Sequence, residues 1–154
     1  LAENGYEELA YNMITRTDFP SYGNWIVRGA TSLYESFFDE GESLPSLNHH
    51  FWGDVSAWFY TYLAGIRINP TLRDVSNVDI KPCFIERLDN AKAYHITPCG
   101  KIAVEWNRKG AEIELAVEAD SRLHGEIVLL CVCYPFREDQ SKSTFSSVCH
   151  PRTH

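Results

Sequence analysis

The spacing of the apolar residues changes along the chain, and this change limits the possible folds more than any other feature. Before residue 67 apolar residues recur every three or four positions, which is the spacing of one helix face. After Val78 they recur every second position, as in a strand with one buried face. Helices followed by strands predict an α+β fold. We expect helices over 1–66, a small antiparallel sheet domain over 67–134 and a loose tail over 135–154.

Three helices are expected in the first part. The first ends before Pro20, because the residue before a proline avoids the helical conformation. The second is expected over about 31–39, and the third over about 50–64 with Gly65 as its C-cap. The apolar face of the first helix consists of Tyr6, Leu9, Ala10, Met13 and Ile14.

The second part contains the pattern of a hairpin around a turn at 107–110. An apolar run over 127–134 predicts a central strand, whereas the stretch 137–147 is polar, lacks a period and is expected to be loose. The inward face of the hairpin is expected to consist of Ile102, Val104, Trp106, Ile113, Leu115 and Val117. Glu112, Glu114 and Glu118 alternate with the last three and are interpreted as a solvated outer face.

Composition excludes several classes of function. The chain has 154 residues, 44% of them hydrophobic, and a net charge of -7, which disfavours nucleic acid as a partner because its phosphates would be repelled. No apolar run approaches the about 18 residues that indicate a membrane span. The five cysteines are odd in number and form no C-x-x-C pair, which favours a reducing, cytoplasmic compartment over disulfides or zinc. A neutral ligand such as a sugar is compatible with this composition, and no cofactor is implied.

The expected helices carry more apolar surface than three short helices can bury among themselves. Phe51, Trp52, Trp58 and Phe59 all lie on the third one. Soluble monomers avoid large exposed apolar patches. We therefore expect these helix faces to pack against a larger helical domain or to mediate self-association. The start at Leu1, directly before a helical pattern, suggests a piece of something longer.

Glu35 is the first candidate for chemistry. Hydrolysis of a glycosidic bond uses two carboxyl groups, one as acid and one as base or nucleophile. An expected position early in a helix would favour the ionised form that a base requires. The same spacing allows a second interpretation, because Ser32 and Glu35 form an S-x-x-E capping box in which the glutamate bonds to the backbone.

Histidines and aromatic residues surround this glutamate in the sequence. His49 could hydrogen-bond a sugar hydroxyl or water, or it could simply begin a helix, as could His50. A metal site is not predicted, since adjacent histidines point in different directions and no H-E-x-x-H is present. Trp25 and Trp52 are the aromatic residues best placed to stack on a sugar, while most aromatics at helical spacing belong to a core.

Several short motifs in order resemble one family. The chain reads Gly29-Ala30-Thr31-Ser32-Leu33-Tyr34-Glu35, then Ser46-Leu47-Asn48-His49, then Leu63-Ala64-Gly65-Ile66. This is similar to the bacterial α-L-rhamnosidases of glycoside hydrolase family 78, whose pattern is approximately G-A-T-T-x-W-E, S-x-N-H and a helix that ends in A-G-I. Ser32 and Tyr34 depart mildly from it, and the loop between Glu35 and His49 is shorter than in many members. The resemblance covers about residues 5 to 130.

The resemblance implies the end of an (α/α)6 barrel followed by a C-terminal β-sandwich. It also implies inverting hydrolysis of terminal α-L-rhamnosides, with Glu35 as the general base and His49 as a substrate-binding histidine. The family's general acid lies well upstream of the G-A-T motif, where this chain has no matching stretch, so the isolated chain is expected to be inactive. The rival hypotheses are a non-catalytic carbohydrate-binding or interaction module built on the sheet half, and a remnant without function. A reading-frame slip after Tyr134 is a further hypothesis.

Overall fold

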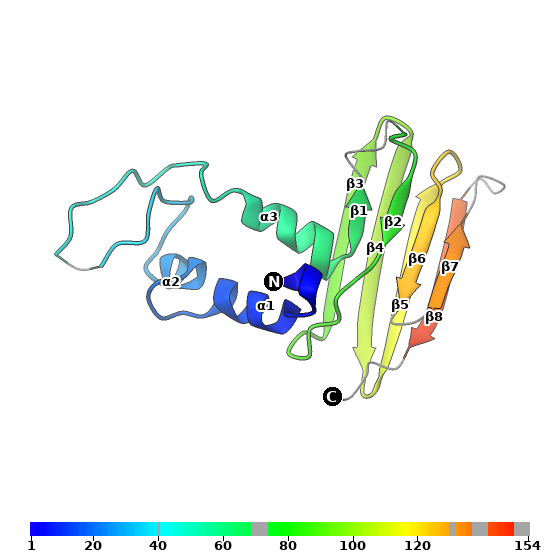
Figure 1. Cartoon of the computed structure of the whole chain (residues 1–154), viewed down its shortest axis with the longest axis horizontal. Coiled ribbons are helices and arrows are strands. Elements are labelled where there is room, and N and C mark those ends of the chain that lie inside the picture. The colour runs from blue at the N-terminus through cyan, green and yellow to red at the C-terminus, as the bar shows by residue number, and fades with distance from the viewer. Residues whose placement is uncertain (40, 69–73, 130–131, 137–141, 150–154) are drawn as a thin grey trace. The chain divides into compact units, whose positions relative to one another are not determined.

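The computed structural model describes residues 1–39, 41–68, 74–129, 132–136 and 142–149 (Figure 1). The chain divides into two compact units, Leu1–Trp58 and Phe59–His154, which are described separately below. The first unit is helical and the second consists of β-sheets, so the fold class is α+β, as the change of period predicts. Helices and strands meet close to the predicted boundary at 66/67, which itself stays a prediction.

The first unit begins with the short 3₁₀ helix η1 (Ala2–Asn4) and the helix α1 (Glu7–Thr15), which confirms the first predicted helix. Helix α2 (Tyr22–Val27) follows, in a stretch for which none of the three predicted helices was placed. It forms because Ser21 supplies an N-cap, its Oγ accepting a hydrogen bond of 3.0 Å from the backbone N–H of Asn24. At the other end Gly29 has a φ of 85°, a left-handed conformation that ends the helix.

The prediction of a second helix over 31–39 is wrong. The described part of this segment is irregular, and its backbone groups bond to residues 46–49 instead of to one another. Thr31, Tyr34, Phe37 and Phe38 are weak helix formers, so little is lost by this alternative pairing.

The third predicted helix is present but shorter and divided. Helix α3 (Asp54–Trp58) begins four residues later than expected and closes the first unit. The chain then continues into the π-helix η2 (Phe59–Leu63), which belongs to the second unit. Gly65 follows with a φ of 78°, and an added Cβ there would lie 2.2 Å from the backbone nitrogen of Pro82. Glycine is therefore required at this position both by conformation and by space.

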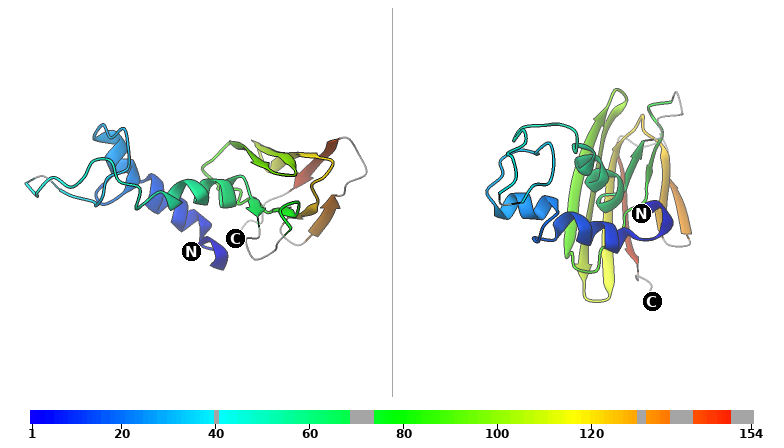
Figure 2. Two further views of the ribbon diagram at one scale, coloured as in Figure 1. Left: turned by 90° about the horizontal axis from the view of Figure 1, so that it is seen from above. Right: turned by 60° about the vertical axis from the view of Figure 1, so that its left-hand side comes forward.

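The second unit is built from two four-stranded sheets (Figures 1 and 2). One sheet has the order β1-β2-β6-β7 and the other the order β3-β4-β5-β8. All neighbouring strands pair antiparallel except β2 and β6, which are parallel. The strands are β1 (Ile66–Ile68), β2 (Val78–Ile80), β3 (Asn90–Thr97), β4 (Gly100–Lys109), β5 (Glu112–Asp120), β6 (Gly125–Leu129), β7 (Val132–Phe136) and β8 (Lys142–Cys149).

The buried residues of the two sheets form one hydrophobic core. The predicted hairpin is confirmed as β4 and β5, joined at 110–111, and all six residues of its predicted inward face are buried. Residues of the other sheet, such as Val78, Ile80 and Ile127, complete the cluster, and the free thiol of Cys99 packs at its edge. Trp106 is fully buried and its indole Nε1–H donates a hydrogen bond of 2.8 Å to the carbonyl of Leu63.

Two predictions about the end of the chain differ from the structure. The apolar run 127–134 is not one central strand but contributes to the two strands of a hairpin, β6 and β7. Pro135 fits this arrangement because β7 is an edge strand, where a missing N–H is tolerated. Within the predicted loose tail, β8 pairs with β5 from Ile113↔Cys149 to Asp120↔Lys142. The free backbone edge of β5 can recruit such a strand without a hydrophobic period, whereas residues 137–141 and 150–154 lie outside the described residues.

Candidate active site

Hydrogen bonds in the first unit join the two segments that contain Glu35 and His49. The backbone N–H of Glu35 donates to the carbonyl of Ser46 at 2.9 Å, and the N–H of His49 donates to the carbonyl of Leu33 at 2.8 Å. The hydroxyl of Ser32 donates to the carbonyl of Leu47 between them. The motif G-A-T-S-L-Y-E and the motif S-L-N-H, eleven residues apart from Glu35 to Ser46, therefore lie side by side.

Glu35 is exposed and is held at two points besides its own N–H. One oxygen of its carboxyl group, Oε2, accepts a hydrogen bond of 3.2 Å from the backbone N–H of Ser46. Its carbonyl accepts a hydrogen bond of 3.0 Å from the indole Nε1–H of Trp52. Because the residue lies in a loop, both the capping box with Ser32 and the helix-dipole argument are wrong. The carboxyl group bonds to the backbone of a different segment instead.

The imidazole of His49 is half-buried and has a defined hydrogen bond on one side. Its Nδ1 accepts a hydrogen bond of 3.1 Å from the backbone N–H of Phe51. A neutral ring with an accepting Nδ1 carries its proton on Nε2, so this nitrogen is a donor. The ring of His50 stacks on that of His49, with centroids 5.2 Å apart and planes 12° apart. His49 therefore presents a donor suited to an oxygen acceptor such as a sugar hydroxyl.

The two tryptophans predicted to contact a sugar differ in burial. Trp25 is only 2% exposed and stacks on Phe37 with ring centroids 4.5 Å apart, so it has no face open to a ligand. Its expected role in sugar stacking is therefore corrected to packing within the unit. Trp52 is half-buried and lies 5.5 Å from Phe37 and 6.4 Å from Tyr22 between ring centroids.

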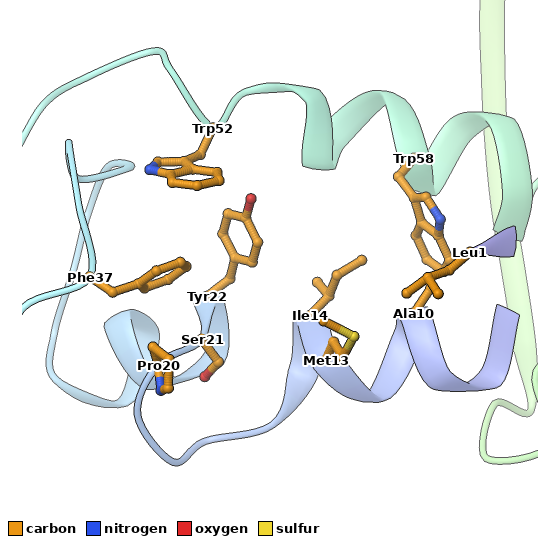
Figure 3. Close-up of a pocket in the computed structure, with 10 residues that line it drawn as sticks. All are labelled: Leu1, Ala10, Met13, Ile14, Pro20, Ser21, Tyr22, Phe37, Trp52 and Trp58. Atoms are coloured by element: carbon orange, nitrogen blue, oxygen red, sulfur yellow. The ribbon is translucent and has the colours of Figure 1, made fainter. Parts of the chain in front are cut away.

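A pocket of about 380 Å³ lies next to this aromatic cluster, within the first unit (Figure 3). Tyr22, Phe37 and Trp52 line one end, and Trp58 lines the other together with Ala10 of α1. Partial burial, and to a lesser degree the carboxylate of Asp54, raises the pKa of Tyr22. Its hydroxyl therefore stays protonated at neutral pH and can donate a hydrogen bond. Trp52 is the residue that connects the pocket with Glu35.

A metal centre is not formed by the residues that the structure describes, since they contain no group of three or more His, Cys, Asp or Glu side chains suited to one. Likewise, no helix in the described ranges is long and apolar enough to cross a membrane. The chemistry available at the site is that of a carboxylate, an imidazole and aromatic rings. Sequence reasoning missed the contact of Ser46 with Glu35, although Ser46 opens the S-x-N-H motif and could have been suspected from it.

Two models of one family match the chain in succession. The model of the bacterial α-L-rhamnosidase six-hairpin glycosidase domain matches residues 1–63, and the model of the bacterial α-L-rhamnosidase C-terminal domain matches residues 75–129. An α-L-rhamnosidase of Alteromonas sp. (strain LOR) is 29% identical over 135 residues, which are 83% of this chain and 14% of that protein. One of Streptomyces avermitilis is 26% identical over 152 residues, 94% of this chain and 14% of that protein.

Solved structures agree with these matches. The α-L-rhamnosidase of Dictyoglumus thermophilum superimposes with a TM-score of 0.73 at 28% identity over 82% of this chain and 14% of that one. The enzyme of Aspergillus terreus has a TM-score of 0.80 at 19% identity over 98% of this chain and 18% of its own, which shows the fold alone. The S. avermitilis structure, complexed with L-rhamnose, has a TM-score of 0.71 at 20% identity over 97% of this chain and 16% of its own.

The chain spans about 14% of the length of the curated relatives that it matches. The two family models follow each other along it without overlap, at residues 1–63 and 75–129. The helical unit falls within the first match, and most of the sheet unit that the structure describes falls within the second. The chain is therefore similar to the bacterial α-L-rhamnosidases, over a segment that runs from the six-hairpin glycosidase domain into the C-terminal domain.

Proposed function

We propose that this chain carries one half of the catalytic site of a glycoside hydrolase that cleaves terminal α-L-rhamnosides with inversion, and that Glu35 is its general base. The observation that carries the proposal is the hydrogen-bonded pairing of the segment that ends at Glu35 with the segment that ends at His49. Two motifs that resemble those of the family are thus neighbours in space as well as in order. The names of the relatives and the L-rhamnose complex of one of them support the choice of sugar.

In this proposal the carboxylate of Glu35 accepts a proton from a water molecule while the water oxygen attacks the anomeric carbon. The glycosidic bond breaks, and a general acid on the opposite side of the sugar protonates the departing oxygen. The two carboxyl groups of such an inverting site stand roughly 6.5–9.5 Å apart, which leaves room for the water. The exposure of Glu35 is consistent with access of water to the base.

His49 is proposed to bind the sugar. Phe51 occupies its Nδ1 through a backbone N–H, which leaves Nε2–H to donate to a sugar hydroxyl. A half-buried donor is well suited to this, since the ring is restrained by its stacking on His50 yet still reaches the surface. Trp52 is proposed to border the same region.

The isolated chain is proposed to be inactive or nearly so. By the family resemblance the general acid belongs to a stretch upstream of the G-A-T motif, and no residue of this chain is matched to it. A base without an acid leaves the departing oxygen without a proton, and a general acid contributes roughly 10²–10⁴-fold to rate. Purified chain should therefore release L-rhamnose from methyl α-L-rhamnoside, whose alkoxide leaving group needs a proton, no faster than Glu35→Gln does.

Binding of the sugar tests the site more directly than turnover. We expect L-rhamnose, added to ¹⁵N-labelled chain, to shift the amide signals of 32–35 and 46–49 selectively. Shifts confined to the second unit, and unchanged by Glu35→Gln and by deletion of residues 1–66, would instead support the rival carbohydrate-binding module. If no amide signal shifted even at a high concentration of L-rhamnose, this result would count against a rhamnose site in this chain.

Self-association through the helix faces is proposed as well. Leu9 is 50% exposed and Met13 51% exposed on α1, and Ile26 is 71% exposed on α2. Patches of this kind mark interaction sites in soluble proteins. Sedimentation velocity over a hundredfold concentration range should show a rising mass that Leu9→Lys/Met13→Glu reduces. A constant monomer mass would contradict this proposal.

A further inference from the structure

We propose that Trp52 is a positioning residue for Glu35, whose indole N–H fixes the carbonyl of the base while Ser46 fixes its carboxyl group. This inference rests on the proposed function only in the meaning it gives to Glu35 as a base. It is separate from the expectation that Trp52 stacks on a sugar, which stays a prediction. The contact itself can be tested without any ligand.

The orientation of the Trp52 indole is set by other aromatic rings. Its ring is nearly perpendicular to that of Tyr22, at 84°, and to that of Phe51, at 87°, and lies 40° from that of Phe37. Edge-to-face contacts of this kind hold a ring in one orientation. Figure 3 shows the indole nitrogen on the side away from Tyr22, toward the segment that carries Phe37. That segment also carries Glu35, whose carbonyl receives the hydrogen bond of 3.0 Å.

Ser46 holds Glu35 at two further points. Its carbonyl accepts the N–H of Glu35 at 2.9 Å, and its own N–H donates to Oε2 of the carboxyl group at 3.2 Å. The main chain and the side chain of Glu35 are thus tied to the same residue. With the indole of Trp52 on the carbonyl, three polar groups of Glu35 have fixed partners.

The hydrogen bonds of Glu35 with Trp52 and Ser46, called the clamp below, replace the support that a helix would give to Glu35. Glu35 is exposed and lies in an irregular segment, so no regular backbone ladder holds its direction. A catalytic group has to be held close to its productive geometry, and a misplacement of about 1 Å can cost roughly a hundredfold in rate. The aromatic cluster that orients the indole of Trp52 thereby gives the carbonyl of the exposed base a fixed hydrogen-bond donor.

Hydrogen exchange on the full ¹⁵N-labelled chain tests the clamp. Trp52→Phe keeps an aromatic ring in the cluster but removes the N–H donor. We expect the amides of Glu35 and Ser46 to exchange roughly fivefold faster in this variant, as the loss of one hydrogen bond implies. The amides of Ala10 and Arg28, in α1 and at the end of α2, should stay within twofold of the wild type. Trp58→Phe is the matched control, since it removes an indole from the same pocket and should leave Glu35 and Ser46 unchanged.

The carboxyl part of the clamp has its own pair of variants. Glu35→Ala removes the acceptor of the Ser46 N–H and should accelerate exchange of that amide, whereas Glu35→Gln keeps an acceptor oxygen and should restore its protection. A residue that served only to fill space would give no such rescue. Unchanged protection of Glu35 and Ser46 in Trp52→Phe would overturn the proposal.

Unfolding of the whole unit by Trp52→Phe would be recognised by faster exchange at Ala10 and Arg28. In that case the exchange of the Trp52 indole N–H is measured in the wild-type chain instead. It should be at least fivefold slower than that of free N-acetyltryptophanamide, and equal rates would refute the clamp. Failure of the proposed function has a different signature. It would leave these exchange rates as expected while L-rhamnose fails to shift the same amides.

Discussion

The helical unit and the sheet unit bury their apolar residues to very different degrees. In the described part of the helical unit the buried hydrophobic residues are Ala10 and Trp25, whereas the sheet unit has a continuous buried cluster that both of its sheets share. Among the residues whose burial the structure describes, most of the large exposed apolar side chains also lie in the helical unit. The sheet unit therefore contains its own source of stability, while the unit with the candidate site relies on loop hydrogen bonds and one aromatic cluster.

This difference predicts which property a substitution should change in each unit. Substitutions in the sheet unit should change the free energy of unfolding, because they disturb a closed core. Substitutions in the helical unit should mainly change local order around Glu35. The following variants test that contrast, beginning with the largest expected effect.

Trp106→Ala should destabilise the sheet unit by about 3–5 kcal/mol, the usual cost of deleting a large buried aromatic side chain. Trp106 is 0% exposed, packs edge-to-face on Phe84 and bonds the carbonyl of Leu63, so the deletion leaves a cavity and an unpaired carbonyl. Urea unfolding followed by circular dichroism at 218 nm measures the change. Tyr94→Ala, which truncates a 57% exposed aromatic side chain of β3, is the control and should stay within about 0.5 kcal/mol. Equal effects of the two would contradict a core centred on Trp106.

Arg108→Met should cost about 1–3 kcal/mol, since it leaves half-buried carbonyl groups without their donor. The guanidinium of Arg108 donates to three carbonyls, those of Phe84, Ile85 and Leu88, at 3.0–3.1 Å. This side chain thereby fixes the segment between β2 and β3. Methionine retains most of the aliphatic length, so a loss of stability would report the hydrogen bonds, and an unchanged urea midpoint would show that solvent replaces them. Arg122→Met, at an exposed turn position, is the control.

Ser21→Ala should have a smaller and local effect, of about 1 kcal/mol, in the helical unit. The hydroxyl accepts the N–H of Asn24 at 3.0 Å and donates to the carbonyls of Arg16 and Asp18, so it joins the start of α2 to the beginning of the loop that follows α1. Amide exchange at Asn24 and Arg28 should rise while exchange in β4 and β5 stays constant. Ser21→Thr, which keeps the hydroxyl, should behave like the wild type. A rise that extends into β4 would mean that the units do not unfold independently.

The sheet unit was the more predictable of the two from sequence. A strict alternation with β-branched and aromatic residues specifies both the strand and its buried face, and the six inward residues predicted in this way for the β4–β5 hairpin are all buried. Strands without such a period were missed. An example is β8, which pairs with the edge of β5, and this edge exists only once the sheet has formed. The run over 127–134 was predicted as one strand because the residues that it contributes to β6 and to β7 are both rich in apolar types.

The helical unit was less predictable because its segments satisfy one another over a distance. The segment 31–39 forms hydrogen bonds with 46–49 instead of the expected helix. These bonds depend on a partner eleven residues or more away in the sequence. The motifs nevertheless directed attention to Glu35 and His49, which the fold places on paired segments. Burial was the property that spacing could not supply, since Trp25 and Trp52 look alike in sequence and differ in exposure.

The smallest expected effect concerns pH, and it compares one carboxylate in each unit. A hydrogen bond from Arg16 is the main cause that lowers the pKa of Asp18 in the helical unit, and one from Lys92 is the main cause that lowers the pKa of Glu105 in the sheet unit. A lowered folded-state pKa contributes stability above the unfolded value of about 4 and loses it as pH falls through the folded value. Both contributions should therefore be fully present and constant in the neutral range and be lost below about pH 4.

Carboxyl ¹³C titrations of Arg16→Gln and Lys92→Gln separate the two sites. Each substitution should raise the midpoint of its own partner, Asp18 or Glu105, toward the ordinary range and leave the other unchanged. Because both pairs are exposed, salt should produce the same shift in the wild type by screening them. If Lys92→Gln moved the midpoint of Asp18, the two units would be electrostatically coupled, and the stability of one would depend on the charges of the other.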